Sequence, residues 1–282
     1  MKKAFLLAIF ALAIGSTMSA QVSYTFTTID VPGSIFTRAH NINRQGDIVG
    51  LFSVVRGEGH GFLLHNGKFN QIDFPGSTFT SARGINSSGH IVGGYADASN
   101  VDHGFLLKGG HFTALDFPGA ASTDAFDINN AGDIVGVYVD NAGVQHGFLL
   151  KHGRFSTIDF PDVAETDVNG ISNSGVILGA AVNAGGTAIG FRQLRGVFKT
   201  VRFPRAVSTG CGDSNDAGLL VGTYTDMQSV THGFVRTADG FQSLDFPNAI
   251  LTHALGVNTS GNIVGDYQDS SGATHGFLAV PQ

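Results

Sequence analysis

Short segments in which hydrophobic and polar residues alternate make up most of this chain, and turn residues separate them. Between positions 81 and 118, four such segments are rich in Val, Ile, Phe and Tyr, and their period is that of a β-strand. Asn86-Ser87-Ser88-Gly89 is typical of a turn, because Asn bonds forward within the turn and Gly accepts the positive φ at its end. No ten residues after position 20 keep a helical period. The pattern predicts four antiparallel strands, at residues 81–86, 90–96, 103–108 and 112–117.

This four-strand pattern occurs six times with a fixed period of 43 residues. One marker of each copy is Asp-Phe-Pro or a variant of it, and the other is His-Gly-Phe, in which Ile189 replaces the fourth histidine. A fixed period in this range indicates a repeat architecture, and four antiparallel strands per repeat favour a propeller blade. We therefore predict an all-β fold, a six-bladed β-propeller. The competing folds are a pair of three-repeat trefoils and a β-solenoid, which the unbroken period and the absence of end caps disfavour.

The two ends of the repeat array predict how the ring closes. Residues 26–30 have the pattern of a fourth strand without its own blade, whereas the last repeat ends after its third strand, which begins at His275. The N-terminal strand is therefore expected to join the last blade, which would remove the two free sheet edges.

Residues 1–20 differ from the repeats. Lys2 and Lys3 precede an apolar run over positions 4–15 and a small-residue stretch that ends at Ala20. This is the pattern of a secretory signal peptide. We therefore predict a signal peptide at 1–20, a six-repeat propeller domain at 21–282, and a secreted or periplasmic protein. No segment is long and apolar enough to predict a membrane span.

The net charge excludes some classes of binding partner, and the cysteine content indicates the role of Cys211. Loss of the leader would remove two lysines and no acid, which changes the formal net charge from −6 to −8. An acidic exported protein without a basic cluster is a poor binder of nucleic acid or of anionic membranes. The single cysteine, Cys211, falls where the other repeats have Ala or Val, so we expect a small buried residue. We expect a monomer.

The histidines of His-Gly-Phe precede the aspartates of Asp-Phe-Pro by 13 residues. The copy that lacks the histidine, at Ile189, also lacks the aspartate, at Arg202. A two-residue turn would place the two positions opposite each other on neighbouring strands, which predicts buried His–Asp pairs. Histidines spread around a ring cannot converge on one ion, so we predict a structural role and no metal site. The pairs are His60/Asp73, His103/Asp116, His146/Asp159, His232/Asp245 and, across the closure, His275/Asp30.

Ligand binding in propellers is expected at the mouth of the central channel, on the innermost strands. Two positions there vary between repeats, with basic groups on repeats one and two and acids on three and four. This predicts a polar pocket with a basic and an acidic wall, although an ordinary solvated rim explains the same residues. The first position is Arg38, Ser81, Asp124, Asp167, Gly210 and His253, and the second is His40, Arg83, Phe126, Asn169, Gly212 and Leu255.

A third position of the innermost strand alternates between polar residues and glycine, as Asn41, Gly84, Asp127, Gly170, Asp213 and Gly256. The polar residues can form an oxygen ring for a hard cation such as calcium. Gly, Asn and Asp also tolerate a positive φ, so a recurrent bulge explains the alternation, and this is the interpretation we favour. The candidate binding residues at the channel rim are Arg38, His40, Arg83, Asp124, Asp127, Asp167, Asn169, Asp213 and His253.

No catalytic or cofactor motif accompanies these residues. The chain has no Gly-x-Ser-x-Gly elbow, no His-Glu-x-x-His and no Gly-rich phosphate loop after a strand. Its two glutamates, Glu58 and Glu165, have no partner that would make an acid–base pair. We predict no catalytic residue and no cofactor.

The repeated sequence, from Ile-Asp-Phe-Pro-Gly to His-Gly-Phe-Leu-Leu, resembles the HAF-repeat family of exported bacterial proteins, which is named for its His-Ala/Gly-Phe signature. The resemblance covers nearly all of residues 21–282, with departures at Ala181, Ile189 and Arg202. The family has no established activity and no assigned catalytic residues. The resemblance therefore implies export and a repeat architecture and leaves the function open.

Three hypotheses for the function follow. The first is a non-catalytic binding or interaction module that holds a carbohydrate, a small molecule or a protein at the channel mouth. The second is a propeller-type hydrolase or lyase that uses a mixed-charge pocket, which perturbed carboxylates or histidines clustered in one pocket would favour. The third is a structural surface protein, which needs no pocket.

Overall fold

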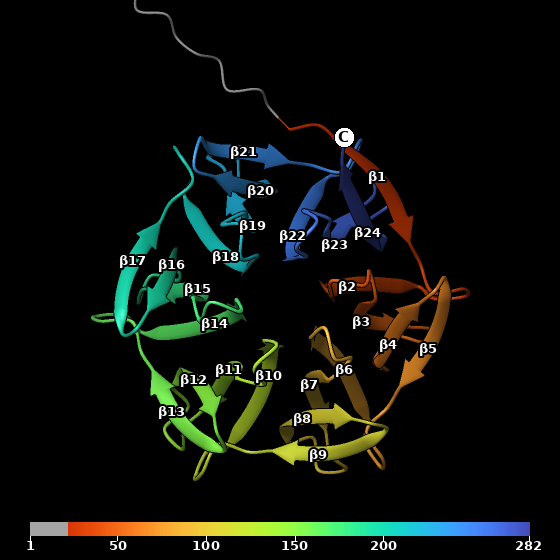
Figure 1. Ribbon diagram of the computed structural model, residues 1–282, viewed down its shortest axis with the longest axis vertical. Helices are drawn as coiled ribbons and strands as arrows, with labels where there is room; N and C mark the ends of the chain where they lie inside the picture. The colour runs from red at the N-terminus through yellow and green to blue at the C-terminus, as the bar shows by residue number, and fades with distance from the viewer. Residues whose placement is uncertain (1–21) are drawn as a thin grey trace, which may run out of the picture.

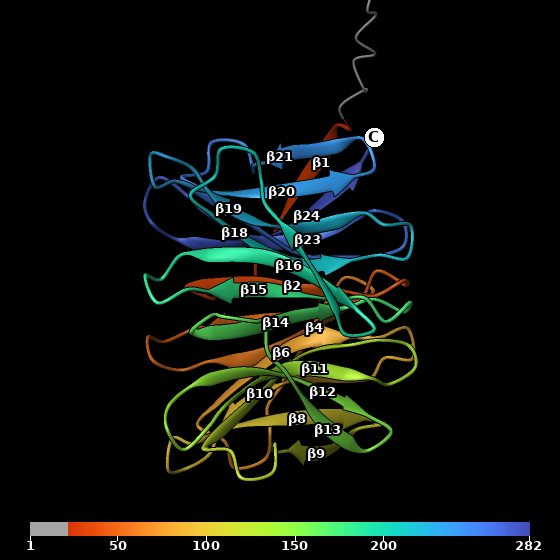
Figure 2. The same ribbon diagram turned by 90° about the vertical axis from the view of Figure 1, so that its left-hand side faces the viewer.

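The computed structural model describes residues 22–282, and the signal peptide predicted at residues 1–20 lies outside the described residues. All regular elements in the described part of the chain are β-strands. They form sheets arranged as a ring around a central axis (Figure 1), and Figure 2 shows this ring edge-on. The predicted all-β propeller is confirmed. Among residues 22–282 there is no helix that is long and apolar enough to cross a membrane.

Each repeat contributes strands that run in order from the axis outward (Figure 1). The innermost strands are β2 (Phe36–Ile42), β6 (Phe79–Ile85), β10 (Ser122–Ile128), β14 (Glu165–Ile171), β18 (Ser208–Ser214) and β22 (Leu251–Val257). The second strands are β3 (Ile48–Ser53), β7 (Ile91–Ala96), β11 (Ile134–Val139), β15 (Ile177–Val182), β19 (Leu220–Thr225) and β23 (Ile263–Gln268). The third strands are β4 (His60–His65), β8 (Asp102–Lys108), β12 (Gln145–Lys151), β16 (Ala188–Leu194), β20 (Thr231–Thr237) and β24 (Thr274–Pro281). The outermost strands are β1 (Tyr24–Ile29), β5 (Lys68–Ile72), β9 (His111–Leu115), β13 (Arg154–Ile158), β17 (Val197–Val201) and β21 (Gly240–Leu244).

The strand bounds confirm the prediction for the second repeat, because β6, β7, β8 and β9 all begin and end within two residues of it. The predicted turn between β6 and β7 also forms. The N–H of Gly89 donates to the carbonyl of Asn86 at 3.0 Å, and Gly89 has a φ of 72°. Alternation and turn chemistry are therefore sufficient to place the strands.

The strands form five sheets, four of which contain the four strands of one repeat each. The fifth sheet has eight strands, β2 to β5 together with β22 to β24 and β1. One parallel pair, Phe36 with Thr274, joins its two parts. The expectation of six separate four-stranded sheets is therefore wrong for the first and last repeats, because their strands β2 and β24 come close enough to pair.

Strand β1 closes the ring. It pairs antiparallel with β24 along its whole length, from Tyr24 opposite Pro281 to Ile29 opposite Gly276. Ile29 is buried in the same hydrophobic cluster as Ala39 and Phe62 of the first repeat. The prediction that the N-terminal strand joins the strands of the last repeat is confirmed.

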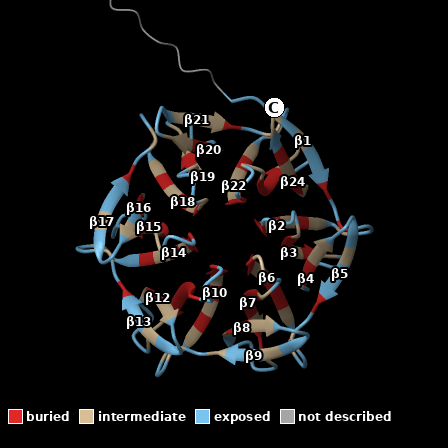
Figure 3. Cartoon of the chain, viewed as in Figure 1, coloured by how far each residue is buried: buried red, intermediate tan, exposed pale blue. Residues whose placement is uncertain are grey.

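The phenylalanine of the marker Gly-Phe lies at the centre of each hydrophobic core. A glycine opposite this ring leaves room for it: a Cβ at Gly93 would lie 2.8 Å from the ring of Phe105. Cys211 is also buried, as predicted, and burial raises the pKa of its thiol to about 12. The outermost strands, for example β9, β13 and β17, are largely exposed (Figure 3). The core rings, all with no exposed surface, are Phe62, Phe105, Phe148, Phe191, Phe234 and Phe277.

A buried threonine on each innermost strand holds the preceding Asp-Phe-Pro loop. The Oγ1 of Thr80 accepts a hydrogen bond from the N–H of Phe74 at 3.0 Å. The same bond reaches from Val31, Phe117, Phe160, Phe203 and Phe246 to Thr37, Thr123, Thr166, Thr209 and Thr252. The chain therefore enters every repeat in the same orientation.

Replacing Ile29 by Ala tests the closure. We expect the free energy of unfolding to fall by ~3 kcal/mol, because the change removes a buried side chain and leaves a cavity. Thr27→Ala, at an exposed position of the same strand, is the control and should cost less than about 0.5 kcal/mol. Urea unfolding curves measure both. Equal, small effects would mean that β1 contributes little to closure.

Candidate functional site: the central channel

A β-bulge in every innermost strand directs one side chain toward the channel. In β2, for example, the register with β3 shifts between Ala39 and Asn41, so that His40 has no partner opposite it. A bulge changes the direction in which the side chain of the extra residue points. The bulged residues are His40, Arg83, Phe126, Asn169, Gly212 and Leu255, which is the second variable position of the sequence.

These bulged side chains surround a cavity of about 190 Å³ at one end of the channel, which we call the wide mouth. His40, Arg83, Phe126 and Asn169 line part of it. Toward β18 and β19 the wall consists of Gly210, Gly212 and Gly222 together with Cys211 and Thr223, and Asn41, Ala254 and Leu255 complete the lining. Gly210 leaves a recess in the wall at the fifth repeat, because a Cβ there would have its nearest atom, Oγ1 of Thr223, 3.6 Å away.

The basic and acidic candidate residues do not form two opposing walls. Arg83 pairs with Asp124 on the next repeat, with Nη2 2.7 Å from Oδ2. Arg38 lies with Nε 2.9 Å from Oδ1 of Asp266, an ion pair in which the N–H is not aligned with the oxygen. The predicted mixed-charge pocket is therefore replaced by ion pairs between neighbouring repeats.

Asp266 is the residue of this site that the sequence analysis missed. It lies on β23, the second strand of its sheet, where most other repeats carry small or aliphatic residues. Its Oδ2 is 2.9 Å from Nδ1 of His253. Burial alone would raise the pKa of Asp266, but the hydrogen bond with His253 and the charge of Arg38 hold it below its usual value. A single charged residue at an otherwise small position was the signal that could have identified it.

His40 and Asn169 are two uncharged polar residues that face the cavity. Burial, together with the charges of Arg83 and Arg38, lowers the pKa of His40 to about 3. Its Nδ1 donates to the carbonyl of Ala82 at 2.9 Å, which leaves Nε2 as an acceptor. The side-chain amide of Asn169 donates to the carbonyl of Cys211 at 3.1 Å, which leaves its oxygen free to accept.

Three buried polar atoms on β6 and β10 have no hydrogen-bond partner within the described chain. They are Oγ of Ser81, Nε of Arg83 and Oδ1 of Asp124. Burial raises the pKa of Asp124 to about 6, although the charge of Arg83 opposes this shift. Buried polar groups are usually satisfied, so atoms of this kind indicate a place for a bound polar molecule.

Asp167 lies apart from the cavity. Its carboxylate accepts a hydrogen bond from the side chain of Gln145 on the preceding repeat. Burial, and then the charge of Glu165, raises its pKa. Of the nine candidate residues, the cavity therefore brings together His40, Arg83 and Asn169, whereas Arg38, Asp124 and Asp167 bond between repeats and His253 bonds with Asp266 within its own repeat.

The third variable position forms the neck of the channel. A Cβ at Gly84 would lie 2.7 Å from the Cα of Asp127, and one at Gly256 would lie 2.8 Å from the Cα of Asn41. Neither glycine has a positive φ. The bulge is present in all six repeats, but it is at the preceding residue, so positive φ does not explain the alternation. Glycine is needed there because the backbone of the next repeat comes too close for a side chain.

The polar residues of the neck bond to the chain itself. Asp127 accepts the N–H of Ile128 at 2.8 Å and that of Ile171 at 2.9 Å, and the amide of Asn41 donates to it at 3.1 Å. Asp213 accepts the N–H of Ser214 and Val257. Burial raises the pKa of Asp127 to about 6, and burial and the charge of Asp127 raise that of Asp213 well above its usual value.

No group of three or more His, Cys, Asp or Glu side chains within residues 22–282 is arranged to hold a metal ion. The carboxylates of the neck serve as acceptors for backbone N–H groups. The structure therefore gives the neck residues a structural role and adds no support for a calcium site.

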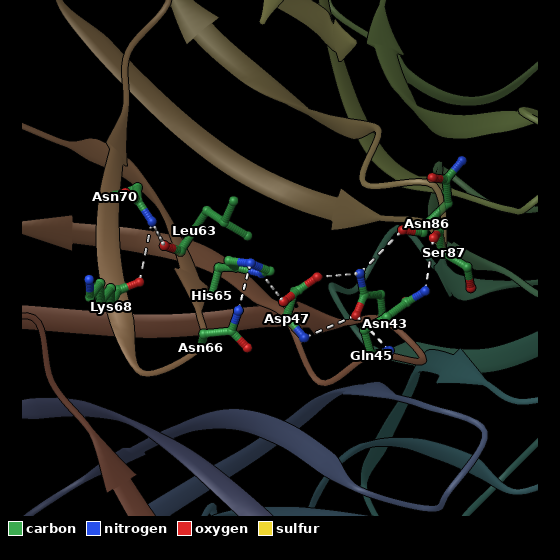
Figure 4. A network of polar contacts seen from close by, with 10 residues as sticks. All are labelled: Asn43, Gln45, Asp47, Leu63, His65, Asn66, Lys68, Asn70, Asn86 and Ser87. Atoms are coloured by element: carbon green, nitrogen blue, oxygen red, sulfur yellow. Dashed lines mark hydrogen bonds and ion pairs between the residues drawn. The ribbon is translucent and has the colours of Figure 1, made fainter. Parts of the chain in front are cut away.

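Asparagines close the opposite end of the channel, the narrow mouth, where the cavity is only about 70 Å³. The side-chain amide of Asn43 donates to the carbonyl of Asn86 on the next repeat, and its oxygen caps its own turn by accepting the N–H of Asp47 (Figure 4). Equivalent bonds to the next repeat come from Asn86, Asn129, Asn215 and Asn258, and Ser172 interrupts the series. This mouth is therefore filled by structural hydrogen bonds.

All five predicted His–Asp pairs form, with Nδ1 to oxygen distances from 2.8 to 3.1 Å. They are not buried as expected: His103 is 24% and Asp116 53% exposed at the side chain. The Nε2 of His103 also lies 3.6 Å from Asp97, and the ring stacks on Tyr95. Tyr95 in turn stacks on Phe74 of the preceding marker with ring centroids 3.6 Å apart. The pair thus belongs to a structural stack between repeats.

No family model matches the chain, and no curated protein matches it. Solved structures with a similar fold include the fucose-specific lectin from Aleuria aurantia, with 8% identity, a TM-score of 0.55, and coverage of 90% of this chain and 97% of that one. A luciferin-regenerating enzyme has 10% identity, a TM-score of 0.56, and coverage of 92% and 95%. The β-propeller domain of the Trilobed protease from Pyrococcus furiosus has 9% identity, a TM-score of 0.50, and coverage of 87% and 97%. At these identities the similarity supports the propeller fold alone.

A Gly84→Ala substitution tests the packing of the neck. We expect it to destabilise the protein by about 1–3 kcal/mol, because the added methyl group meets the backbone of the next repeat. Gly210→Ala makes the same change where the nearest atom, Oγ1 of Thr223, would be 3.6 Å away, and it should be nearly neutral. Urea unfolding compares the two. Similar losses for both variants would contradict the packing explanation.

The His–Asp pairs should make stability depend on pH. Although burial opposes it, the bonds to Asp116 and Asp159 raise the pKa of His103 and His146 above 6.5 in the folded protein. Their contribution is therefore complete below 6.5 and is lost as the pH rises through the raised value. We expect His103→Ile with His146→Ile, which copies Ile189, to remove up to about 1 kcal/mol of stability per pair at pH 6 and less at pH 8.5.

Urea midpoints at the two pH values measure this effect. His111→Ile, an exposed histidine on β9, is the control and should leave the pH dependence of unfolding unchanged. A double variant that loses the same stability at both pH values would show that the imidazoles act by packing alone.

Proposed function

We propose that this protein is an exported, non-catalytic binding module that holds a small ligand at the wide mouth of the propeller channel. The recess at the fifth repeat carries the proposal. There, Gly210 leaves space in the wall, because a Cβ at this position would have no atom closer than 3.6 Å, and Arg83 and His40 face the same cavity of about 190 Å³. Small-molecule sites are typically concave, with a few convergent polar groups.

The chemistry of the wall favours a neutral, hydroxyl-rich ligand such as a monosaccharide. His40 is uncharged, and the charge of Arg83 is balanced by Asp124. The wall nevertheless offers acceptors on His40 and Asn169, and a hydroxyl on Thr223 that both donates and accepts. Phe126 adds apolar surface, with Arg83 4.5 Å above its ring. A fucose-specific lectin is among the structures of similar fold, which is compatible with a sugar ligand.

We also propose that the eight-stranded sheet functions as two blades of a six-bladed ring. Its two halves, β2 to β5 and β22 to β24 with β1, have the same strand pairing as the four-stranded sheets. They are joined by the single pair Phe36–Thr274. Membership of the HAF-repeat family, and export, remain proposals that rest on the repeated His-Gly-Phe and Asp-Phe-Pro markers and on residues 1–20.

The alternative function is a propeller-type hydrolase or lyase. The raised pKa values of Asp124 and Asp127 near the channel favour it, because catalytic acids need shifted pKa values. However, neither carboxylate lines the wide-mouth cavity, and both are held by internal partners. Hydrolysis of aryl glycosides by the purified protein, abolished by Asp124→Asn, would favour the enzyme.

Gly210→Val tests the binding module by filling the recess. The site accepts a side chain without a backbone clash, so the fold should be preserved. We expect isothermal titration with a panel of neutral monosaccharides, L-fucose included, to detect binding to the unmodified protein. The variant should bind at least about tenfold more weakly, a loss of 1.4 kcal/mol.

Asn130→Ala, at the narrow mouth, is the matched control and should bind like the unmodified protein. Equal binding to Gly210→Val would place the ligand elsewhere. Binding of anions such as phosphate and of no neutral sugar would overturn the proposed ligand class.

A further inference from the structure

The fourth repeat carries a basic cluster that the analysis of the sequence overlooked. Residues 168–212 contain no acid, whereas the remainder of residues 21–282 has nine basic and 22 acidic residues. The cluster lies on and beside the hairpin of β16 and β17, on the outer rim of the ring (Figure 1). Its members, all exposed, are Arg192, Arg195, Lys199, Arg202 and Arg205.

None of these five basic side chains forms an ion pair with the described part of the chain. The ion pairs found within residues 22–282 involve Arg38, Arg83 and Lys151 as the only arginine and lysine partners. An unpaired cluster on an acidic protein is therefore not explained by internal electrostatics. It provides a local positive field for an acidic partner.

The same hairpin exposes an apolar slot between the basic side chains. A cavity of about 280 Å³ is lined by Val176, Arg192, Leu194, Val197 and Lys199. On the hairpin, Leu194 pairs across from Val197 and Arg192 from Lys199. In the third repeat the positions of Leu194 and Val197 are occupied by Lys151 and Arg154. The fourth repeat thus replaces a charged pair by an exposed apolar one.

Backbone conformation indicates that two of the arginines are present at a cost to stability. Arg195 has a φ of 51° and Arg205 a φ of 63°. Equivalent positions with a positive φ hold Asn66, Gly109 and His152 in the first case, and Gly33, Gly76, Gly119, Asp162 and Asn248 in the second. Glycine and asparagine tolerate the left-handed region, and arginine does so less well. Strained residues of this kind often mark functional surfaces.

Strand β17 is also the free edge of its sheet, with β16 as its only partner (Figure 3 shows its exposed surface). A free edge presents unpaired N–H and C=O groups that can accept an extended peptide as an additional strand. The outer strands β1, β5, β9, β13 and β21 contain no Asp or Glu, so the edge of a second copy cannot provide the acidic strand that this surface requires.

We propose that this surface, Val176, Arg192, Leu194, Val197 and Lys199 with the edge of β17, binds an extended peptide segment in which every second residue is in turn acidic and aliphatic, so that both kinds lie on the face that Lys199 and Val197 share. Backbone hydrogen bonds to β17 hold the peptide, its acids meet Arg192 and Lys199, and its aliphatic side chains cover Leu194 and Val197. Because this site is on the outer rim, it is independent of the proposed channel ligand.

The test uses a fluorescein-labelled peptide of nine residues, Glu-Ser-Val-Ser-Glu-Ser-Val-Ser-Glu, which places Glu and Val on the same strand face, with binding measured by fluorescence anisotropy on residues 21–282. We expect Lys199→Glu to weaken binding at least about tenfold, equivalent to 1.4 kcal/mol. Arg154→Glu makes the same charge change on β13 and should leave the affinity within about twofold. Thr200→Pro removes an N–H from the edge strand and should weaken binding about as much as Lys199→Glu.

Four outcomes would overturn the proposal. The first is no binding of this peptide to the unmodified protein. The second is equal weakening by Arg154→Glu and Lys199→Glu, which would indicate attraction to overall charge. The third is tighter binding of alginate or of phosphatidylglycerol vesicles than of the peptide. The fourth is self-association in sedimentation velocity that Lys199→Glu abolishes, which would make a second copy the occupant.

Discussion

The antiparallel pairing of β1 with β24 is the interaction on which the rest of the structure depends. Repeats related by a period of 43 residues would otherwise form an open arc with two unpaired sheet edges. Six consecutive pairs, from Tyr24–Pro281 to Ile29–Gly276, join the ends instead. Only a closed ring fixes the innermost strands relative to one another. The wide mouth, the neck and the narrow mouth are all composed of residues from several repeats, and they exist because the ring is closed.

Two ends of one channel have different chemistry because different features of the innermost strand face them. At the wide mouth a bulge exposes one variable residue per repeat, and Gly210 at the fifth repeat leaves a recess. At the narrow mouth, asparagines bond from each repeat to the next and fill the space. Between them, the neck admits a side chain from every second repeat only, because the intervening glycines meet the neighbouring backbone. The sequence repeats six times, but at the axis only every second repeat contributes a side chain, so the packing there has a three-fold pattern.

Local patterns in the sequence were sufficient for the strands, the turns and four of the His–Asp pairs, because each depends on contacts within one repeat, and the fifth pair, His275 with Asp30, follows from the way the ring closes. Comparison between copies identified Asp116 as the partner of His103. The fourth repeat replaces the counterparts of both residues together, by Ile189 and Arg202. Residues that meet across repeats could not be predicted in this way. The pairing of Arg38 with Asp266 depends on how the first and last repeats face each other. The parallel pair between β2 and β24, which merges two sheets, depends on the same geometry.

The glycines of the neck and the basic cluster show two further limits of prediction from the sequence. Gly84 was compatible with a positive φ, and only the position of Asp127 shows that the constraint is steric. Formal net charge averages over the chain, so an acidic total concealed five basic residues on one hairpin. Comparing charge repeat by repeat, in the way the markers were compared, would have shown that the fourth repeat differs from its neighbours.

The closure has a consequence for biosynthesis. A ribosome releases β1 first, yet its partner β24 lies about 250 residues later, so Phe26 and Ile29 remain without their native neighbours until translation is almost complete. Long-range pairing of this kind is slow and leaves an adhesive strand exposed during folding. A nascent chain should therefore depend on a holding chaperone, and a transcript that stops before codon 274 should yield a product without a folded ring.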